Sequence, residues 1–342
     1  MTYVRRNPLQ SAVGALLAVG LLVSAVIATT GSMTRAATSC AGPVGFQPGY
    51  GYGYSYDSQY GYGCPSGTTT TTVAPTTTTT RPPTPRNPDR DSEDGYCLVA
   101  TDGGLFCFND NFNGSLGGKP LNAPIVDADA HPIIPNAYYF FAADGGVFAF
   151  GGAPFVGSMG GKPLNKPIVS GVVTPDGGGY WLVASDGGVF AFGTARFFGS
   201  MGGKPLNKPI TGIAAQQPFG SGYWIVGSDG GIFSFGNATF FGSMGGKPLN
   251  AAIVGMTSTP DGLGYWFVGS DGGIFSFGSA QFFGSMGGKR LNKPVIHIRS
   301  TGTGRGYIIV ATDGGVFCFG DQPFFGSTGS LVLNAPIAGI KT

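Results

Sequence analysis

The amino-acid sequence predicts an all-β protein assembled from six similar units. The phrase DGGxFxF occurs six times, beginning at Asp102, Asp144, Asp186, Asp229, Asp271 and Asp313. Successive copies lie 42, 42, 43, 42 and 42 residues apart. This period is the length of a small supersecondary unit that buries its apolar face only against its neighbours. No window in the repeats has helical periodicity, so we expect strands throughout.

A typical unit, residues 166–207, contains four short apolar stretches separated by turn residues. We expect strands at 167–174, 180–185 and 189–192, and a short fourth strand at 196–200. The DGG phrase supplies the hairpin loop between the second and third strands, because glycine accepts positive φ. Strands two and three are apolar at consecutive positions, which indicates that both of their faces are covered.

Four strands in about 42 residues is typical of a β-propeller blade. The two ends of the repeat region complete each other. The first unit begins at Gly95 without a first strand, and residues 336–342 form a first strand with no unit after it. If that segment pairs with the sheet starting at Tyr96, the ring closes as a six-bladed β-propeller. A β-solenoid is the alternative, but it needs capping ends and none is visible.

The repeat phrases also resemble a known family. TPDGxGYWxVxSDGGxFxFG together with FFGSMGGKPLN looks like the Gly-rich β-propeller repeat of exported actinobacterial proteins, sometimes found behind a Thr/Pro stalk. The resemblance covers residues 95–342. It implies a secreted or cell-surface propeller and carries no catalytic residue onto this chain.

Composition limits the function classes. The chain has 342 residues, of which 42% are hydrophobic and 11% charged, with 63 glycines and 25 prolines. Such a chain can build a sizeable core with many tight turns. Its net charge of +2 gives no argument for nucleic acid as a partner, because that partner needs a concentrated basic face.

The first part of the chain predicts export. Arg5 and Arg6 precede the uncharged run 9–28, and small residues follow at Ala36 and Ala37. We expect residues 1–36 to act as a cleaved signal peptide or as a retained signal anchor, since the run is nearly long enough to span a bilayer. Either outcome puts the repeats in the extracellular space or on the cell surface, and membrane contact is expected only through this segment.

Two further segments precede the repeats. Residues 37–64 are rich in glycine and tyrosine, and we expect them to be flexible, with an adhesive tyrosine patch as the alternative. Cys40 and Cys64 bracket this segment and are expected to close it as a disulfide, since an exported protein meets an oxidising environment. Lipidation of Cys40 is the alternative. The Thr/Pro-rich residues 65–94 cannot pack a core and predict an extended stalk.

Most repeated polar and aromatic residues are expected to serve the fold. The DGG aspartates recur in every unit and suit turns. The tryptophans Trp181, Trp224 and Trp266 share one position, which favours a core between blades over a sugar-stacking platform. The lysines of the GGKPLN loops would form a rim that could engage an anionic polymer, although a solvated turn is the simpler interpretation.

The positions where the repeat is broken indicate a site. In the first strands, polar residues interrupt an otherwise small or apolar set on one side of the strand. They lie in three units that become neighbours only when the ring closes. We call them the channel cluster and predict a polar ligand site at the mouth of the central channel, with charge pairing and hydration of the channel as the alternative. Its members are Asp127, Asp129, His297, Arg299 and Lys341.

The remaining cysteines lie in the repeats. With a three-residue hairpin loop at 101–103, Cys97 and Cys107 would face each other across adjacent strands and could form a disulfide, leaving Cys318 unpaired.

We therefore expect a monomeric, non-catalytic binding module, with a glycan or cell-wall polymer as the candidate partner. Asp and His could in principle serve as acid and base, but no nucleophile or metal-ligand spacing accompanies them, so no catalytic residue, metal or cofactor is predicted. A propeller hydrolase or lyase using the channel cluster and an architectural surface protein are the alternatives.

Overall fold

The computed structural model describes residues 95–342. The segments predicted at 1–36, 37–64 and 65–94, and the predicted Cys40–Cys64 pair, lie outside the described residues.

The described residues are all-β and contain eighteen strands and no helix, so no helix in this range could cross a membrane. The strands form six three-stranded antiparallel sheets. In chain order the first nine are β1 (Tyr96–Ala100), β2 (Leu105–Phe108), β3 (Ile125–Ala130), β4 (Tyr138–Ala142), β5 (Val147–Phe150), β6 (Ile168–Val173), β7 (Gly179–Ala184), β8 (Val189–Gly193) and β9 (Ile210–Ala215). The other nine are β10 (Gly222–Gly227), β11 (Ile232–Gly236), β12 (Ile253–Ser258), β13 (Gly264–Gly269), β14 (Ile274–Gly278), β15 (Val295–Ser300), β16 (Gly306–Ala311), β17 (Val316–Gly320) and β18 (Ile337–Lys341).

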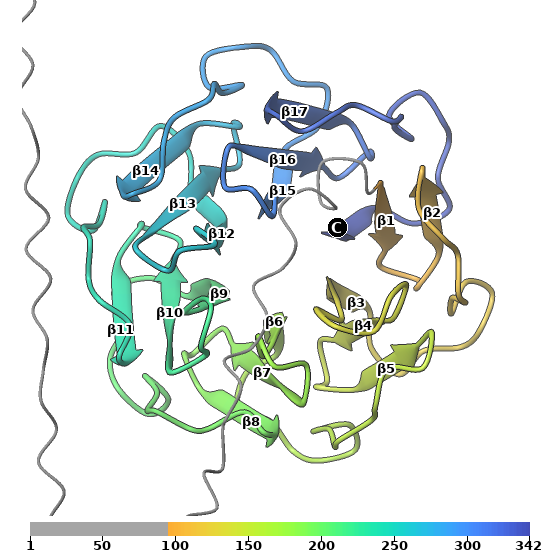
Figure 1. Cartoon of the computed structure of the whole chain (residues 1–342), viewed down its shortest axis with the longest axis horizontal. Coiled ribbons are helices and arrows are strands. Elements are labelled where there is room, and N and C mark those ends of the chain that lie inside the picture. The colour runs from red at the N-terminus through yellow and green to blue at the C-terminus, as the bar shows by residue number, and fades with distance from the viewer. Residues whose placement is uncertain (1–94) are drawn as a thin grey trace, which may run out of the picture. The chain divides into compact units, whose positions relative to one another are not determined.

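The sheets stand in a ring, each with one strand nearest the centre (Figure 1). Five sheets are consecutive in the chain: β3–β4–β5, β6–β7–β8, β9–β10–β11, β12–β13–β14 and β15–β16–β17. The sixth has the order β18–β1–β2, so the C-terminal strand supplies the inner strand of the first sheet, as the sequence predicted. The arrangement is consistent with a six-bladed propeller-like repeat.

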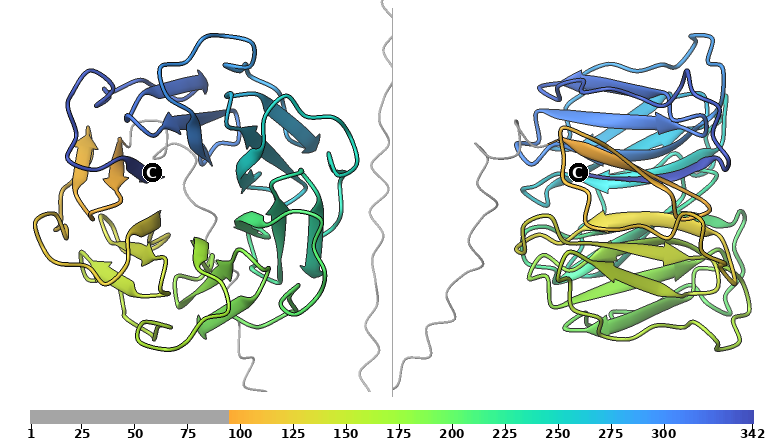
Figure 2. Two further views of the ribbon diagram at one scale, coloured as in Figure 1. Left: turned by 180° about the vertical axis from the view of Figure 1, so that it is seen from behind. Right: turned by 90° about the vertical axis from the view of Figure 1, so that its right-hand side faces the viewer.

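The two faces of the ring carry different loops (Figure 2). Strands in each sheet are antiparallel, so the loops that leave the inner strands all lie on one face, here called the mouth face. The DGG hairpins and the GGKPLN loops lie on the opposite face, here called the hairpin face. In every DGG hairpin the aspartate Oδ1 accepts a hydrogen bond from the amide two residues on, at 2.9 to 3.0 Å. These aspartates therefore hold turns.

The expected fourth strand does not form. Residues 196–200 and the equivalent segments have no strand, and each sheet has three strands instead of about four. Their polar backbone groups are bound by a tyrosine of the next sheet instead. The hydroxyl of Tyr223 donates to the carbonyl of Gly199 at 2.6 Å and accepts from the amide of Phe198 at 3.3 Å. The same pair of contacts joins Tyr96 to Phe325 and Gly326, across the closure of the ring.

The core lies between neighbouring sheets. The prediction for the tryptophans is confirmed, because Trp181, Trp224 and Trp266 are at most 1% exposed. The ring of Trp181 lies 5.5 Å from that of Tyr223 in the next sheet, and its indole N–H donates to the carbonyl of Arg196 at 2.8 Å. Aromatic residues on the second strands thus join adjacent sheets.

A predicted disulfide strengthens the closing sheet. Cys97 of β1 and Cys107 of β2 are directly opposite in register and are disulfide-bonded, which confirms the sequence prediction. The bond fits an oxidising, extracytoplasmic compartment. Within residues 95–342, Cys318 is the free cysteine, and burial raises the pKa of its thiol to about 11.

Candidate functional site at the centre of the ring

The centre of the ring contains a buried carboxylate held by residues of two other inner strands. Asp127 of β3 is fully buried. Its Oδ2 accepts from the Ser170 hydroxyl at 2.7 Å and from the Gly171 amide at 3.2 Å, both on β6. Its Oδ1 lies 2.9 Å from Nε2 of His297 and 3.5 Å from Nη2 of Arg299, both on β15. Because a buried charge is tolerated only when it is paired and hydrogen-bonded, these contacts allow Asp127 to sit there ionised.

The surroundings of Asp127 change its acidity. Burial by itself would raise the pKa of the carboxyl. The charges of His297 and Arg299, with hydrogen bonds from His297 and Ser170, outweigh burial and lower the pKa of Asp127 to about 2. Asp127 is therefore a carboxylate at any neutral pH.

Arg299 joins three strands around this carboxylate. Its Nη2 donates to the carbonyl of Ala128 on β3 at 2.8 Å and lies 3.5 Å from Oδ1 of Asp129. Its Nε donates to the carbonyl of Ile340 on β18 at 3.4 Å. The second oxygen of Asp129 accepts from the Val173 amide of β6 at 2.9 Å. Arg299 and Asp129 therefore link the inner strands across the point where the ring closes.

A glycine on the intervening strand makes this arrangement possible. β18 lies between β15 and β3, and contributes Gly339 beside Asp127. A Cβ at Gly339 would lie 3.2 Å from Oδ1 of Asp127, the atom that His297 contacts. A larger residue would therefore crowd the His297–Asp127 pair.

One nitrogen in the cluster has no partner among the described residues. His297 is 8% exposed, and its Nδ1 is buried without a hydrogen bond within residues 95–342. Nδ1 can accept in the neutral ring and donate in the charged ring. A buried polar atom of this kind is usually satisfied by a water molecule or a ligand.

A cavity of about 400 Å³ opens above the cluster on the mouth face. Asp129 and Arg299 contribute charged groups to its wall, and Thr257, Ser258 and Ser300 contribute hydroxyls. Its outer edge is formed by apolar residues of the mouth-face loops, namely Pro132, Ile133, Pro175, Pro218 and Pro260. A concave site with a few converging polar groups and an apolar edge is typical of ligand-binding cavities.

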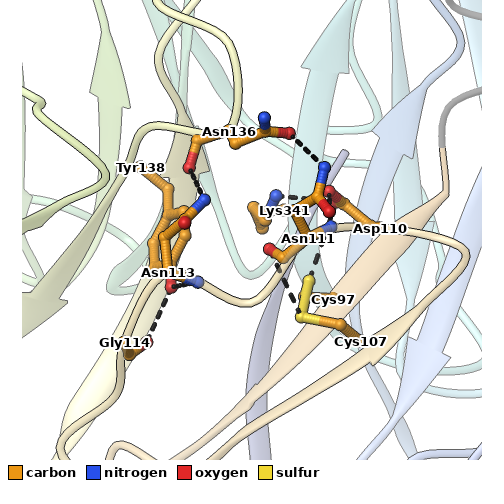
Figure 3. The surroundings of a disulfide bond; sticks show 9 residues. All are labelled: Cys97, Cys107, Asp110, Asn111, Asn113, Gly114, Asn136, Tyr138 and Lys341. Carbon is orange, nitrogen blue, oxygen red and sulfur yellow. Dashed lines mark hydrogen bonds and ion pairs between the residues drawn. A yellow bond between two sulfur atoms is a disulfide. The ribbon is translucent and has the colours of Figure 1, made fainter.

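The structure brings together four members of the predicted channel cluster, Asp127, Asp129, His297 and Arg299. Lys341 has other partners. Its ammonium is 2.6 Å from Oδ2 of Asp110, in the segment after β2, and 5.0 Å from the centre of the Tyr138 ring (Figure 3). This pairing draws the long side chain away from the channel and along the closing sheet.

Several residues of the network and of the cavity were not predicted. Ser170 holds Asp127, and the hydroxyls and prolines of the mouth-face loops shape the opening. The loop residues differ between units, and that variation was the available signal. His131 stabilises one such loop: its Nδ1 accepts from the amides of Ile133 and Ile134 at 3.1 and 2.9 Å.

The order of the polar groups bears on catalysis. In a Ser–His–Asp triad the imidazole stands between the hydroxyl and the carboxylate and takes the hydroxyl proton. Here Asp127 stands between Ser170 and His297, so the imidazole does not contact the hydroxyl. Among the described residues no group of three or more His, Cys, Asp or Glu side chains could hold a metal ion.

Residues 95–342 thus define an all-β repeat protein with a buried polar network at the centre of a ring of sheets. Neither the family models nor the curated proteins contain a match to the chain. The likeness to the exported propeller repeat therefore rests on the repeat phrases themselves.

Proposed function

We propose that residues 95–342 form a six-bladed β-propeller that serves as a non-catalytic binding module of an exported protein. The mouth cavity takes a polar segment of a polysaccharide or of another envelope polymer. The observation that carries the proposal is the cavity itself, where charged groups and hydroxyls from different sheets converge beneath an apolar edge. Sugar residues present hydroxyls and C–H faces together, which suits both parts of this lining.

The geometry favours binding over hydrolysis. Asp127 is fully buried and engaged by two strands, and the Ser170 hydroxyl donates to it. Neither group is placed to attack a substrate in the cavity or to exchange a proton with one. Arg299 and Asp129 border the cavity, and they are placed to bind polar groups of a ligand.

The proposal extends to the rest of the chain. Residues 1–36 would direct export or anchor the protein, residues 37–64 would form a flexible segment, and residues 65–94 would act as a stalk that spaces the module from the membrane or envelope. The Cys97–Cys107 disulfide supports an extracytoplasmic location.

Narrowing the cavity tests the proposed site. Ala130 lines the cavity at the end of β3, so an Ala130→Leu substitution should project a larger side chain into it and leave the buried network in place. Ala143→Leu is a matched control, since Ala143 follows β4 on the hairpin face and is also partly exposed. The full protein and both variants would be applied to an array of glycans and cell-wall polymers at two salt concentrations.

We expect saturable binding that Ala130→Leu weakens at least tenfold, a loss of at least about 1.4 kcal/mol in binding free energy. Ala143→Leu should leave the affinity unchanged. Binding that survives in Ala130→Leu would place the polymer elsewhere. Absence of binding to every polymer would contradict the proposed function.

A further inference from the structure

Six phenylalanines are exposed on the outer circumference of the ring. Each lies at the same position of its unit, in the segment that follows the third strand and runs round the outside (Figure 1). Each side chain is 57 to 61% exposed. The six residues are Phe112, Phe155, Phe197, Phe240, Phe282 and Phe324.

The repeats themselves show that this position is phenylalanine in all six units, whereas the residue before it varies freely and the residue after it is phenylalanine in only four. The residue before the exposed phenylalanine is Asn111, Pro154, Arg196, Thr239, Gln281 or Pro323. The residue after it is Asn113, Val156, Phe198, Phe241, Phe283 or Phe325. The following position packs towards the core and yet tolerates Asn and Val. A residue that is mostly exposed gains little from burial, so packing does not explain why all six units keep phenylalanine.

Grooves border this circumference on the hairpin face. One, of about 330 Å³, is lined by Asn250, Asp271, Phe275, Phe282 and Ser285 at the sheet β12–β13–β14. The next sheet, β15–β16–β17, has a groove of about 290 Å³ lined by the equivalent residues Asn292, Asp313, Phe317 and Ser327. We call these the rim grooves.

The two rim grooves differ in charge but share their other chemistry. Pro248 and Ala251 line the first, whereas Arg290 and Lys293 stand at the equivalent places in the second. A ligand common to both grooves is therefore not selected by its charge. The shared groups are an aromatic ring, an amide, a hydroxyl and a carboxylate, which can contact the C–H face of a sugar and hydrogen-bond its hydroxyls.

We propose that the two rim grooves, the first of which Phe282 lines, act together with the equivalent exposed phenylalanines of the other units as binding sites for the sugar residues of a neutral polysaccharide. Several weak sites on one rigid ring bind a polymer far more tightly than one site does, because later contacts form at a high effective concentration. These sites are independent of the mouth cavity, which opens on the opposite face.

Affinity electrophoresis of the full protein tests the proposal, with four neutral polymers in the gel: amylopectin, hydroxyethylcellulose, galactomannan and arabinogalactan. Polygalacturonate serves as a charged comparison. The variants are Phe282→Ala alone and the sixfold change of Phe112, Phe155, Phe197, Phe240, Phe282 and Phe324 to Ala. Phe219→Ala is the matched control, because Phe219 is 66% exposed on the mouth face. Circular dichroism confirms that each variant is folded.

We expect at least one neutral polymer to retard the protein, a small loss of retardation in Phe282→Ala, and a loss of affinity greater than tenfold in the sixfold variant. Phe219→Ala should be retarded like the wild type. Retardation by none of the four polymers, or retardation that persists in the folded sixfold variant, would overturn the inference. Retardation lost in Ala130→Leu and kept in the sixfold variant would leave the mouth cavity as the sole polysaccharide site and likewise refute the rim grooves.

Discussion

At the scale of single residues, Asp127 has the strongest effect on the centre of the ring. It stands where the other inner strands have Ser170, Gly212, Gly255, His297 or Gly339. Its carboxylate satisfies groups from two other inner strands, so one departure from the repeat organises several sheets. The same residue makes the stability of the ring depend on pH.

The pKa of Asp127 is lowered from 3.8 to about 2, so the folded state binds its proton less readily than the unfolded state does. The resulting stabilisation is complete above about pH 4 and is lost as the pH falls from about 4 to about 2. The shift corresponds to about 2 kcal/mol. Urea unfolding between pH 6 and pH 2 should show a steeper acid loss in the wild type than in Asp127→Asn by about this amount. Parallel curves for the two proteins would disprove the assignment.

A second prediction concerns an unsatisfied hydroxyl. The Oγ of Ser276, on β14, is buried with no hydrogen-bond partner among the described residues. In the sheets β3–β4–β5 and β6–β7–β8 the equivalent residues are Ala149 and Ala191. Ser276→Ala should therefore raise the free energy of unfolding by about 1 kcal/mol, because the buried hydroxyl loses its water contacts without compensation.

Urea unfolding measures this change. Ser300→Ala is a suitable comparison, since that hydroxyl donates to the carbonyl of Ser258 at 3.1 Å and its removal should lower stability. A destabilised Ser276→Ala would mean that the hydroxyl has a partner in solution.

At the scale of elements, the sequence predicted four strands in each unit and three of them form, because alternating turns and apolar runs mark those three locally. The prediction of a fourth strand, at 196–200 in the typical unit, was wrong. Apolar composition there reflects packing on the next sheet, and its backbone is satisfied by a tyrosine hydroxyl from 24 residues further on. A contact of this kind leaves no periodic signal in the segment itself.

The tyrosine contact should stabilise each junction between sheets. Tyr223→Phe removes the hydroxyl that binds the carbonyl of Gly199 and the amide of Phe198. Both groups then lose a partner near the core, and we expect a loss of about 1 to 2 kcal/mol in urea unfolding. Tyr265→Phe should cost a similar amount, since its hydroxyl contacts Gly242 and Phe241 in the same way. An unchanged midpoint in both variants would show that water replaces the hydroxyl.

Part of the candidate site, like part of the fold, could be predicted from the sequence. Departures from the repeat identified Asp127, Asp129, His297 and Arg299, and strand alternation placed them on one side. The direction taken by Lys341 depends on Asp110, whose position is set by an irregular segment after β2. The conformations of the mouth-face loops likewise could not be predicted from the repeat pattern, because the lengths and residues of these loops differ between units.

At the scale of the whole molecule, the ring is held closed by β18. This strand pairs with β1, and its Lys341 forms an ion pair with Asp110 that is nearly inaccessible to solvent. The Cys97–Cys107 disulfide joins β1 to β2 within the same sheet and does not cross to β18. Closure therefore depends on non-covalent contacts.

Deleting residues 336–342 should destabilise the ring more than breaking the disulfide does. The deletion exposes the edge of β1, opens the core beneath it and leaves Asp110 unpaired. Calorimetry and limited proteolysis of the truncated protein should show a lower and broader thermal transition and cleavage near β1. Cys97→Ala/Cys107→Ala should keep a single sharp transition at a reduced temperature. A truncated protein as stable as the wild type would show that closure contributes little.

The pairing of β18 with β1 has a consequence for how such a ring can change. Cys97 lies opposite Lys341, so Gly95 and Thr342 are at neighbouring ends of adjacent strands. The fold of the ring therefore does not require the chain ends of this domain to lie between β18 and β1. A circularly permuted gene, with these two points joined and new ends placed in the loop between β14 and β15, would encode the same six sheets in the same spatial order.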